Sequence, residues 1–356
     1  MSVIIFILIL GLLIFIHELG HFLVAKKAGI RVDEFAIGFP PRIFSFVKNG
    51  TRYALNMIPF GGYVKIYGES PEDGADDKNA TDSMINKSKP VQALVLVAGV
   101  VFNMILAFII VWILFMRGVD FPEQLVPFAS QSEGVRVEYV VEDSVAQIAG
   151  LQVNDIVLEV TTPTYESVTD PISIANILYS ETKEVTDLTL LRKKEVIELT
   201  LVPLDSETRF GFSLTDRVYI KDNPITALYH SYLMTGHLTK LTTIGLFDFF
   251  GKLFTGRANF EEVAGPVGIV SLVDKAADNG LNDVLFLTAI ISINLAILNL
   301  LPIPALDGGR LVVVAIEAIR KRDLDYKKVA IGNLVGFLLL IGLMILLTFH
   351  DIKNLF

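Results

Sequence analysis

The 356-residue chain is apolar, with 52% hydrophobic and only 19% charged residues, whereas an average soluble domain carries about 25% charged residues. Its formal net charge of −9 argues against a basic face and hence against nucleic acid as a partner. Cysteine is absent, which excludes disulfides, thiolate metal sites and cysteine nucleophiles. The composition predicts a membrane protein.

Four segments are long and apolar enough to cross a bilayer, which takes about 20 residues of helix. They are residues 2–25, 91–116, 283–301 and 329–349. The sequence therefore predicts a polytopic α-helical membrane protein with about four transmembrane helices, in direct contact with membrane lipid.

Basic residues concentrate in two connections, the one between the first and second spans and the one between the third and fourth. The N-terminal flank has no Lys or Arg, and the C-terminal tail has only Lys353. By the positive-inside rule both connections are cytoplasmic. Both termini and the long middle segment, residues 117–282, are then expected outside the cytoplasm.

The first connection contains an unusual stretch, residues 53–68, in which apolar and polar residues alternate around Pro59, Gly61 and Gly62. The alternation predicts a β-hairpin with its turn at the two glycines. Non-helical backbone at membrane depth survives only against protein or a wet cavity. We expect a membrane-associated hairpin, the alternative being an ordinary cytoplasmic one.

The middle segment is composite. Residues 134–204 contain short alternating segments typical of strands around a short helix, so they predict a soluble β-rich domain. Residues 224–254 are helical in pattern and amphipathic, which favours an interfacial helix over a fifth span. The membrane part then divides into a first half, residues 1–116, and a second half, residues 264–356.

The first span carries the motif H-E-L-G-H, with His17, Glu18 and His21. Positions i and i+4 share a helix face, so both imidazoles can reach one Zn²⁺ ion, with Glu18 beside them as a proton acceptor. Ionisable residues inside a membrane helix are costly and usually mark function. The alternatives are polar residues bonded to neighbouring helices, or a proton relay.

A catalytic zinc needs a third protein ligand and an open position. Asp307 is the candidate, because it lies in the segment NLLPIPALDGGR, where prolines and glycines interrupt the third span and should line a cavity. The alternative is a helix cap or turn residue. Nearby Asn299 could hydrogen-bond a substrate backbone or an oxyanion, whereas Asn294 and Asn103 are interpreted as contacts between helices.

Several motifs together resemble one family. They are HELGH, NMIPFGGYVKIYGE (56–69), AGVVFNMILA (98–107), AGPVGI (264–269) and NLLPIPALDGGR (299–310), with SVAQIAGLQVNDIVLEV (144–160) similar to a PDZ domain. Over nearly its whole length the chain resembles the site-2 protease family of intramembrane zinc metalloproteases, in its bacterial regulator-of-sigma-E type.

The resemblance implies that His17, His21 and Asp307 bind Zn²⁺ and that Glu18 activates water. It also implies that the glycine-rich loop, with Gly61 and Gly62, pairs with an unwound substrate strand, and that Asn299 handles substrate. Two features depart from the family pattern. We identify one PDZ-like domain where some members have two, and its loop has Asn154 where a glycine is usual.

The expected function is hydrolysis of peptide bonds within single-span membrane proteins, such as anti-sigma factors or remnant signal peptides, in the bacterial inner membrane. The active site would lie toward the cytoplasm, and the PDZ-like domain outside would act as a filter. Two alternatives remain: a transporter or proton relay that uses the same ionisable residues, and a membrane-tethered PDZ adaptor without catalytic activity.

Overall fold

We describe the protein from a computed structural model. It describes residues 2–69, 80–122, 125–128, 135–169, 171–179, 184–192, 195–203, 210–215, 217–257, 260 and 264–355. The chain forms two compact units, Met1–Leu114 with Leu238–Phe356, and Phe115–His237. We call them the membrane unit and the outer unit.

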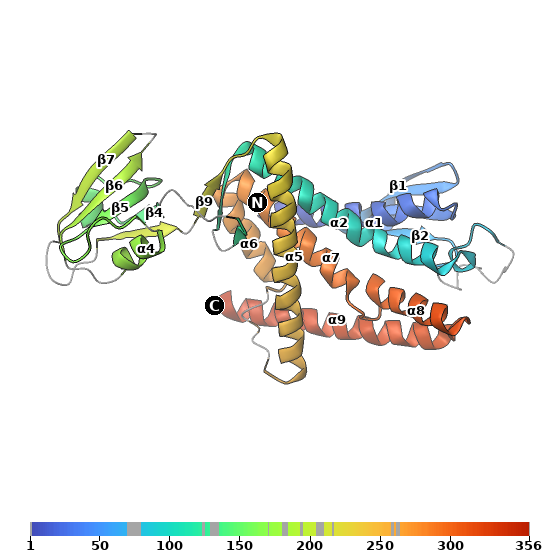
Figure 1. The fold of residues 1–356 in the computed structure, drawn as a ribbon. Coiled ribbons are helices and arrows are strands. Elements are labelled where there is room, and N and C mark those ends of the chain that lie inside the picture. The colour runs from blue at the N-terminus through green and yellow to red at the C-terminus, as the bar shows by residue number, and fades with distance from the viewer. Residues whose placement is uncertain are drawn as a thin grey trace. The chain divides into compact units, whose positions relative to one another are not determined.

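Four long apolar helices confirm the predicted spans (Figure 1): α1 (Ser2–Lys27), α2 (Lys89–Arg117), α7 (Leu281–Leu300) and α9 (Tyr326–Leu355). Each is long and hydropathic enough to cross a bilayer, so the chain is a multi-pass membrane protein. The other helices that the structure describes are η2 (Met84–Asn86), α3 (Val145–Ile148), α4 (Pro171–Tyr179), α5 (Pro224–Phe254), α6 (Pro266–Asn279) and α8 (Asp307–Arg320).

Helices α1 and α2 lie side by side and approach each other at two glycines (Figure 1). A Cβ on Gly20 would lie 2.8 Å from the carbonyl carbon of Ala98 and 3.0 Å from the backbone nitrogen of Gly99. Small residues permit such close backbone approach between membrane helices. The glycine in H-E-L-G-H therefore sets the helix packing behind the two histidines.

The connection between α1 and α2 forms an antiparallel pair of long strands, β1 (Val32–Lys48) and β2 (Thr51–Ile66). Their turn is Asn49–Gly50, and both residues have positive φ, 49° and 76°. Asn-Gly is the preferred sequence for a two-residue hairpin turn of this kind. The predicted hairpin of residues 53–68 was therefore wrong in its turn, because Gly61 and Gly62 lie inside β2.

The first half of β1 pairs with two different parts of β2. Phe35, in the first half of β1, pairs with both Val64 and Tyr53, while Ile37 pairs with both Gly62 and Leu55. The first half of β1 is thus flanked on both sides by β2. Residues 62–66 pair with β1 alone among the described pairings, so they form an edge of the sheet, which we call the edge strand.

The outer unit contains a five-stranded sheet with the order β7-β6-β5-β4-β8, consistent with an inserted PDZ-like domain (Figure 1). Its strands are β4 (Val135–Val140), β5 (Ile156–Thr161), β6 (Thr186–Arg192), β7 (Glu195–Leu201) and β8 (Phe212–Thr215). Its core includes Val137, Val157, Ile174 and Leu188. A separate pair joins β3 (Val119–Pro122) to β9 (Arg217–Ile220).

The sheet extends beyond the predicted domain of residues 134–204, because β8 pairs with β4. Both predicted limits, 134 and 204, lie outside the described residues. β8 is separated from the other strands in the sequence, and local patterns do not show which distant strands pair. The sequence alone therefore did not predict the pairing of β8 with β4.

The backbone conformation of the loop before β5 explains why Asn154 can stand where a glycine is usual. This residue has a φ of 75°, a conformation that asparagine tolerates better than most residues other than glycine. The next residue, Asp155, is 1% exposed and accepts hydrogen bonds from Nε and Nη2 of Arg192 at 2.7 and 2.6 Å. It also accepts one from the backbone of Gln152, so one carboxylate holds the whole loop.

Replacing Asp155 with Asn should destabilise the outer unit by about 2 kcal/mol, the typical cost of losing hydrogen bonds to a charged group. We expect faster hydrogen exchange at the amides of β5 and β6 in the full-length protein. Asp187→Asn is the matched control, because Asp187 is exposed on the same sheet and, among the described residues, accepts a side-chain hydrogen bond from Thr200 alone. Equal effects of the two changes would contradict the prediction.

Candidate active site

Helix α1 places both imidazoles on one buried face. His17 and His21 are separated by one helical turn, and both are buried, whereas Glu18 is half-buried. The Nε2 atoms of the two histidines are 3.1 Å apart. The face they share is directed toward α2, where Gly99 leaves room for both rings.

The third member of the cluster comes from the far end of the chain. Asp307 is the first residue of α8, after Leu306 at the N-cap position, and its carboxylate does not cap the helix. Its Oδ2 lies 3.0 Å from Nε2 of His17 and 3.3 Å from Nε2 of His21. The structure thus brings together three residues that the sequence separates by 290 positions.

Two glycines after Asp307 let α8 start at this place. A Cβ on Gly309 would lie 2.7 Å from the carbonyl carbon of Ile303, and one on Gly308 would lie 2.5 Å from that of Leu300. Real Cβ atoms do not approach backbone so closely. The motif L-D-G-G therefore packs the start of α8 tightly against the end of α7 and the loop that follows it.

The donor set fits zinc. Nδ1 of His21 donates to the carbonyl oxygen of Val95 at 2.8 Å, because a carbonyl can only accept. That bond leaves the Nε2 lone pair free to point at a metal, the usual way in which a second hydrogen bond orients a histidine ligand. Two imidazole nitrogens and one carboxylate oxygen, all within 4.8 Å of one another, match the ligands of catalytic zinc sites.

The edge strand lies beside Glu18. The backbone of Val64 hydrogen-bonds the Glu18 carboxylate, so the N–H of Val64 is directed away from β1 and toward α1. Because direction alternates along a strand, the backbone groups of Gly62 and Ile66 share that outward side. A sheet edge with outward N–H groups therefore borders the cluster.

A buried carboxylate on β1 fastens the edge strand. Glu34 accepts hydrogen bonds from Arg42 at 2.7 Å and from the Tyr63 hydroxyl at 3.0 Å. Burial raises the pKa of Tyr63, and the hydrogen bond to Glu34 raises it further, so the phenol keeps its proton. This network holds the residue next to Val64 in place.

The other predicted residues have different surroundings. Gly61 has a φ of 111° and Gly62 lies against the carbonyl of Ala36, so both allow β2 to pack closely against β1. Asn299 is half-buried near the end of α7 and has no hydrogen bond to the cluster in the described part of the chain. Its role in substrate binding stays a prediction.

The two other membrane asparagines differ. Asn294 accepts a hydrogen bond from Thr242 of α5 at 3.1 Å, which confirms a contact between helices. Asn103 is fully buried, and Ser292 donates to its backbone carbonyl at 2.8 Å, but its side-chain amide has no partner among the described residues.

Sequence reasoning missed one residue of the site, Gly99. A Cβ on Gly99 would lie 2.6 Å from Cε1 and 2.8 Å from Nδ1 of His17. The motif AGVVFNMILA contains Gly99, but no local pattern relates it to a histidine 82 positions earlier.

Comparison with known proteins agrees with this geometry. Residues 5–343 match the model of peptidase family M50. The chain belongs to that family. It is 31% identical to the zinc metalloprotease RasP of Bacillus licheniformis, over 100% of this chain and 99% of that protein. It is 30% identical to the regulator of sigma-W protease RasP of Bacillus subtilis, with the same coverage. The chain is therefore a zinc metalloprotease of the M50, RasP type, with zinc as its cofactor.

Replacing Gly99 with Ala should push the His17 ring out of the cluster, because the added methyl has no room. We expect at least a tenfold loss of zinc affinity, by analogy with changes that misorient a ligand. Gly11→Ala is the control, since a Cβ there meets nothing within 4 Å. Zinc titration with a competing chelator measures the change, and equal affinities of both variants would contradict it.

Proposed function

We propose that this protein cleaves peptide bonds within the membrane-spanning segments of single-span membrane proteins. The observation that carries the proposal is the convergence of His17, His21 and Asp307, because both histidines lie inside a candidate membrane span. His17 is eight residues before the predicted end of that span, or about 12 Å along a helix that rises 1.5 Å per residue.

In this proposal His17, His21 and Asp307 hold zinc. The bound ion would supply Lewis acidity, lowering the pKa of a water and stabilising negative charge on the scissile carbonyl. Glu18 accepts the proton of the attacking water and later gives it to the leaving amine. The hydrogen bond from Val64 keeps the Glu18 carboxylate oriented for that work.

The edge strand would hold the substrate by strand addition, since it has outward backbone groups next to Glu18. A helical substrate must unwind before its peptide bonds become accessible, and pairing with residues 62–66 would keep it extended. Gly61 and Gly62 would allow the substrate backbone to approach closely, and Asn299 would contact it from α7.

We infer the substrate class and the orientation from related proteins and from charge. The relative in Bacillus subtilis is named a regulator of sigma-W protease, which supports anti-sigma factors as substrates, with remnant signal peptides as a second class. The distribution of basic residues supports a bacterial inner-membrane protein with its termini outside and its active site toward the cytoplasm. The PDZ-like domain of residues 134–204 would then filter substrates outside, and residues 224–254 would lie at the interface.

Membership of a zinc metalloprotease family weighs against the transporter or proton-relay alternative. The convergence of the two histidines and Asp307 weighs against an inactive PDZ adaptor, because a protein without catalysis has no need to keep three costly ionisable groups together. Zinc content measured together with cleavage separates all three functions.

Glu18→Gln should abolish cleavage, by a factor of about 10² or more, while zinc content stays near one ion per chain, because the ligands remain.

Asp307→Asn should lower both the cleavage rate and the zinc content, since a neutral amide is a poorer zinc ligand than a carboxylate. Zinc analysis and cleavage of a single-span test protein are measured on the same preparations. Normal turnover by Glu18→Gln would remove Glu18 from its role, and full zinc affinity in Asp307→Asn would place the third ligand elsewhere.

Val64→Pro should reduce cleavage at least tenfold with zinc retained, because proline removes the N–H that contacts Glu18. Val64→Ala is the matched control, since it shortens the side chain but keeps the N–H. Cleavage rates and zinc contents of both variants are compared with those of the unmodified protein. Full activity of Val64→Pro would contradict a role for the edge-strand backbone.

A further inference from the structure

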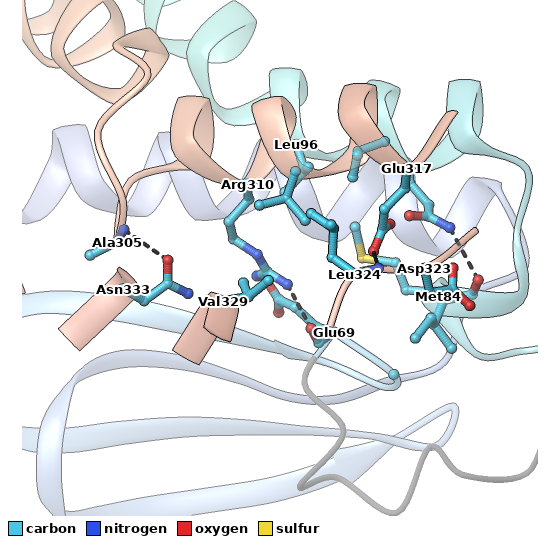
Figure 2. Close-up of a pocket in the computed structure, with 15 residues that line it drawn as sticks. Glu69, Met84, Leu96, Ala305, Arg310, Glu317, Asp323, Leu324, Val329 and Asn333 are labelled. Carbon is cyan, nitrogen blue, oxygen red and sulfur yellow. Dashed lines mark hydrogen bonds and ion pairs between the residues drawn. The ribbon is translucent and has the colours of Figure 1, made fainter. Parts of the chain in front are cut away.

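An ion pair in the membrane unit joins the two elements that border the metal cluster. Arg310 lies on α8, one turn after Asp307, and Glu69 lies three residues after the end of β2. Nη1 of Arg310 pairs with Oε1 of Glu69, and Nη2 donates to the backbone carbonyl of Glu69 at 2.6 Å. Figure 2 shows the Arg310 side chain reaching from its helix to Glu69.

This contact positions the backbone of Glu69 as well as its carboxylate. Arginine presents donors in a rigid fork, so two simultaneous bonds to one residue define its position more closely than a lysine would. The two side chains are only 30% and 26% exposed and line a cavity of about 390 Å³. Partial shielding makes such a pair stronger than an ion pair on an open surface.

The ion pair connects two segments that each contact a residue of the active site. Five residues before Glu69, Val64 hydrogen-bonds Glu18, and three residues before Arg310, Asp307 contacts both histidines. The edge strand and the ligand on α8 are therefore connected through this pair. A shift of α8 relative to β2 would change the gap between the strand edge and the metal position.

We propose that Arg310 is a positioning residue, which sets the distance between the edge strand and the metal cluster through Glu69. The inference rests on the proposed function, in which that strand holds the substrate extended. Its consequence is specific: loss of the pair weakens the productive binding of substrate, and the zinc ligands stay assembled.

The same helix offers a matched control. Nζ of Lys89, at the start of α2, pairs with Oε2 of Glu317 at 2.7 Å, and these side chains are 23% and 13% exposed. Oε1 of Glu317 also accepts a hydrogen bond from the backbone of Leu324. Glu317 lines the same cavity, and this second pair joins α8 to α2, with no described hydrogen bond or ion pair to β2. Its loss removes a comparable contact without releasing the edge strand.

The test compares Glu69→Gln, Arg310→Gln, their combination and Glu317→Gln in the full-length protein. The substrate is a fluorescently labelled single-span remnant of a signal peptide in phospholipid vesicles, and KM, kcat, zinc content and melting temperature are measured. We expect each single change in the pair to raise KM about tenfold with zinc retained, and the double variant to match the single ones, as coupled residues do. Arg310→Lys should fall between, and it replaces Arg310→Gln if that variant does not fold. Glu317→Gln should lower the melting temperature and leave KM unchanged.

The inference would be overturned by a similar rise of KM in Glu317→Gln, by loss of zinc in the Arg310 and Glu69 variants, or by additive effects in the double variant. An unmodified protein that binds zinc but does not cleave the remnant would instead contradict the proposed function. Cleavage by the unmodified protein with unchanged KM in the pair variants would contradict only the positioning role.

Discussion

The membrane unit depends on one contact, the approach of the Asp307 carboxylate to the imidazoles of His17 and His21. Groups of this kind are costly in hydrocarbon unless they are paired or bound to a metal. The surrounding packing serves this contact. Gly20 and Gly99 bring α1 and α2 close, and Gly308 and Gly309 let α8 begin against the end of α7. Each glycine stands where a methyl group would push a ligand or its helix away.

The sheet next to the cluster follows from the same constraint. A strand edge exposes backbone N–H groups, which is unfavourable near a membrane unless something accepts their hydrogen bonds. The Glu18 carboxylate is the acceptor for Val64, and the network around Glu34 keeps the neighbouring residue in place. An unpaired strand edge at this position is unfavourable for a protein that has no extended partner to bind there. Strand addition by a substrate would turn the unpaired edge into a paired one.

Much of the fold could be predicted because membrane spans and H-E-L-G-H are local signals. Hydropathy located four spans to within a few residues, and the i, i+4 spacing placed His17 and His21 on one face. Asp307 was open between ligand and cap until the resemblance favoured a ligand. The hairpin turn was predicted at Gly61 and Gly62 because glycines are typical of turns, whereas the turn is Asn49–Gly50. Gly99 and the pairing of β8 with β4 depend on distant contacts, which no local pattern contains.

The residues of the candidate active site all lie in one of the two units. His17, Glu18, His21, Val64 and Asp307 all belong to the membrane unit, whereas the five-stranded sheet belongs to the outer unit. The outer unit contributes no side chain to the described cluster. The loop held by Asp155 and Arg192 stabilises that unit from within, using contacts that the metal cluster does not share. Changes in that loop should therefore affect the stability of the outer unit and leave the contacts of the cluster in place.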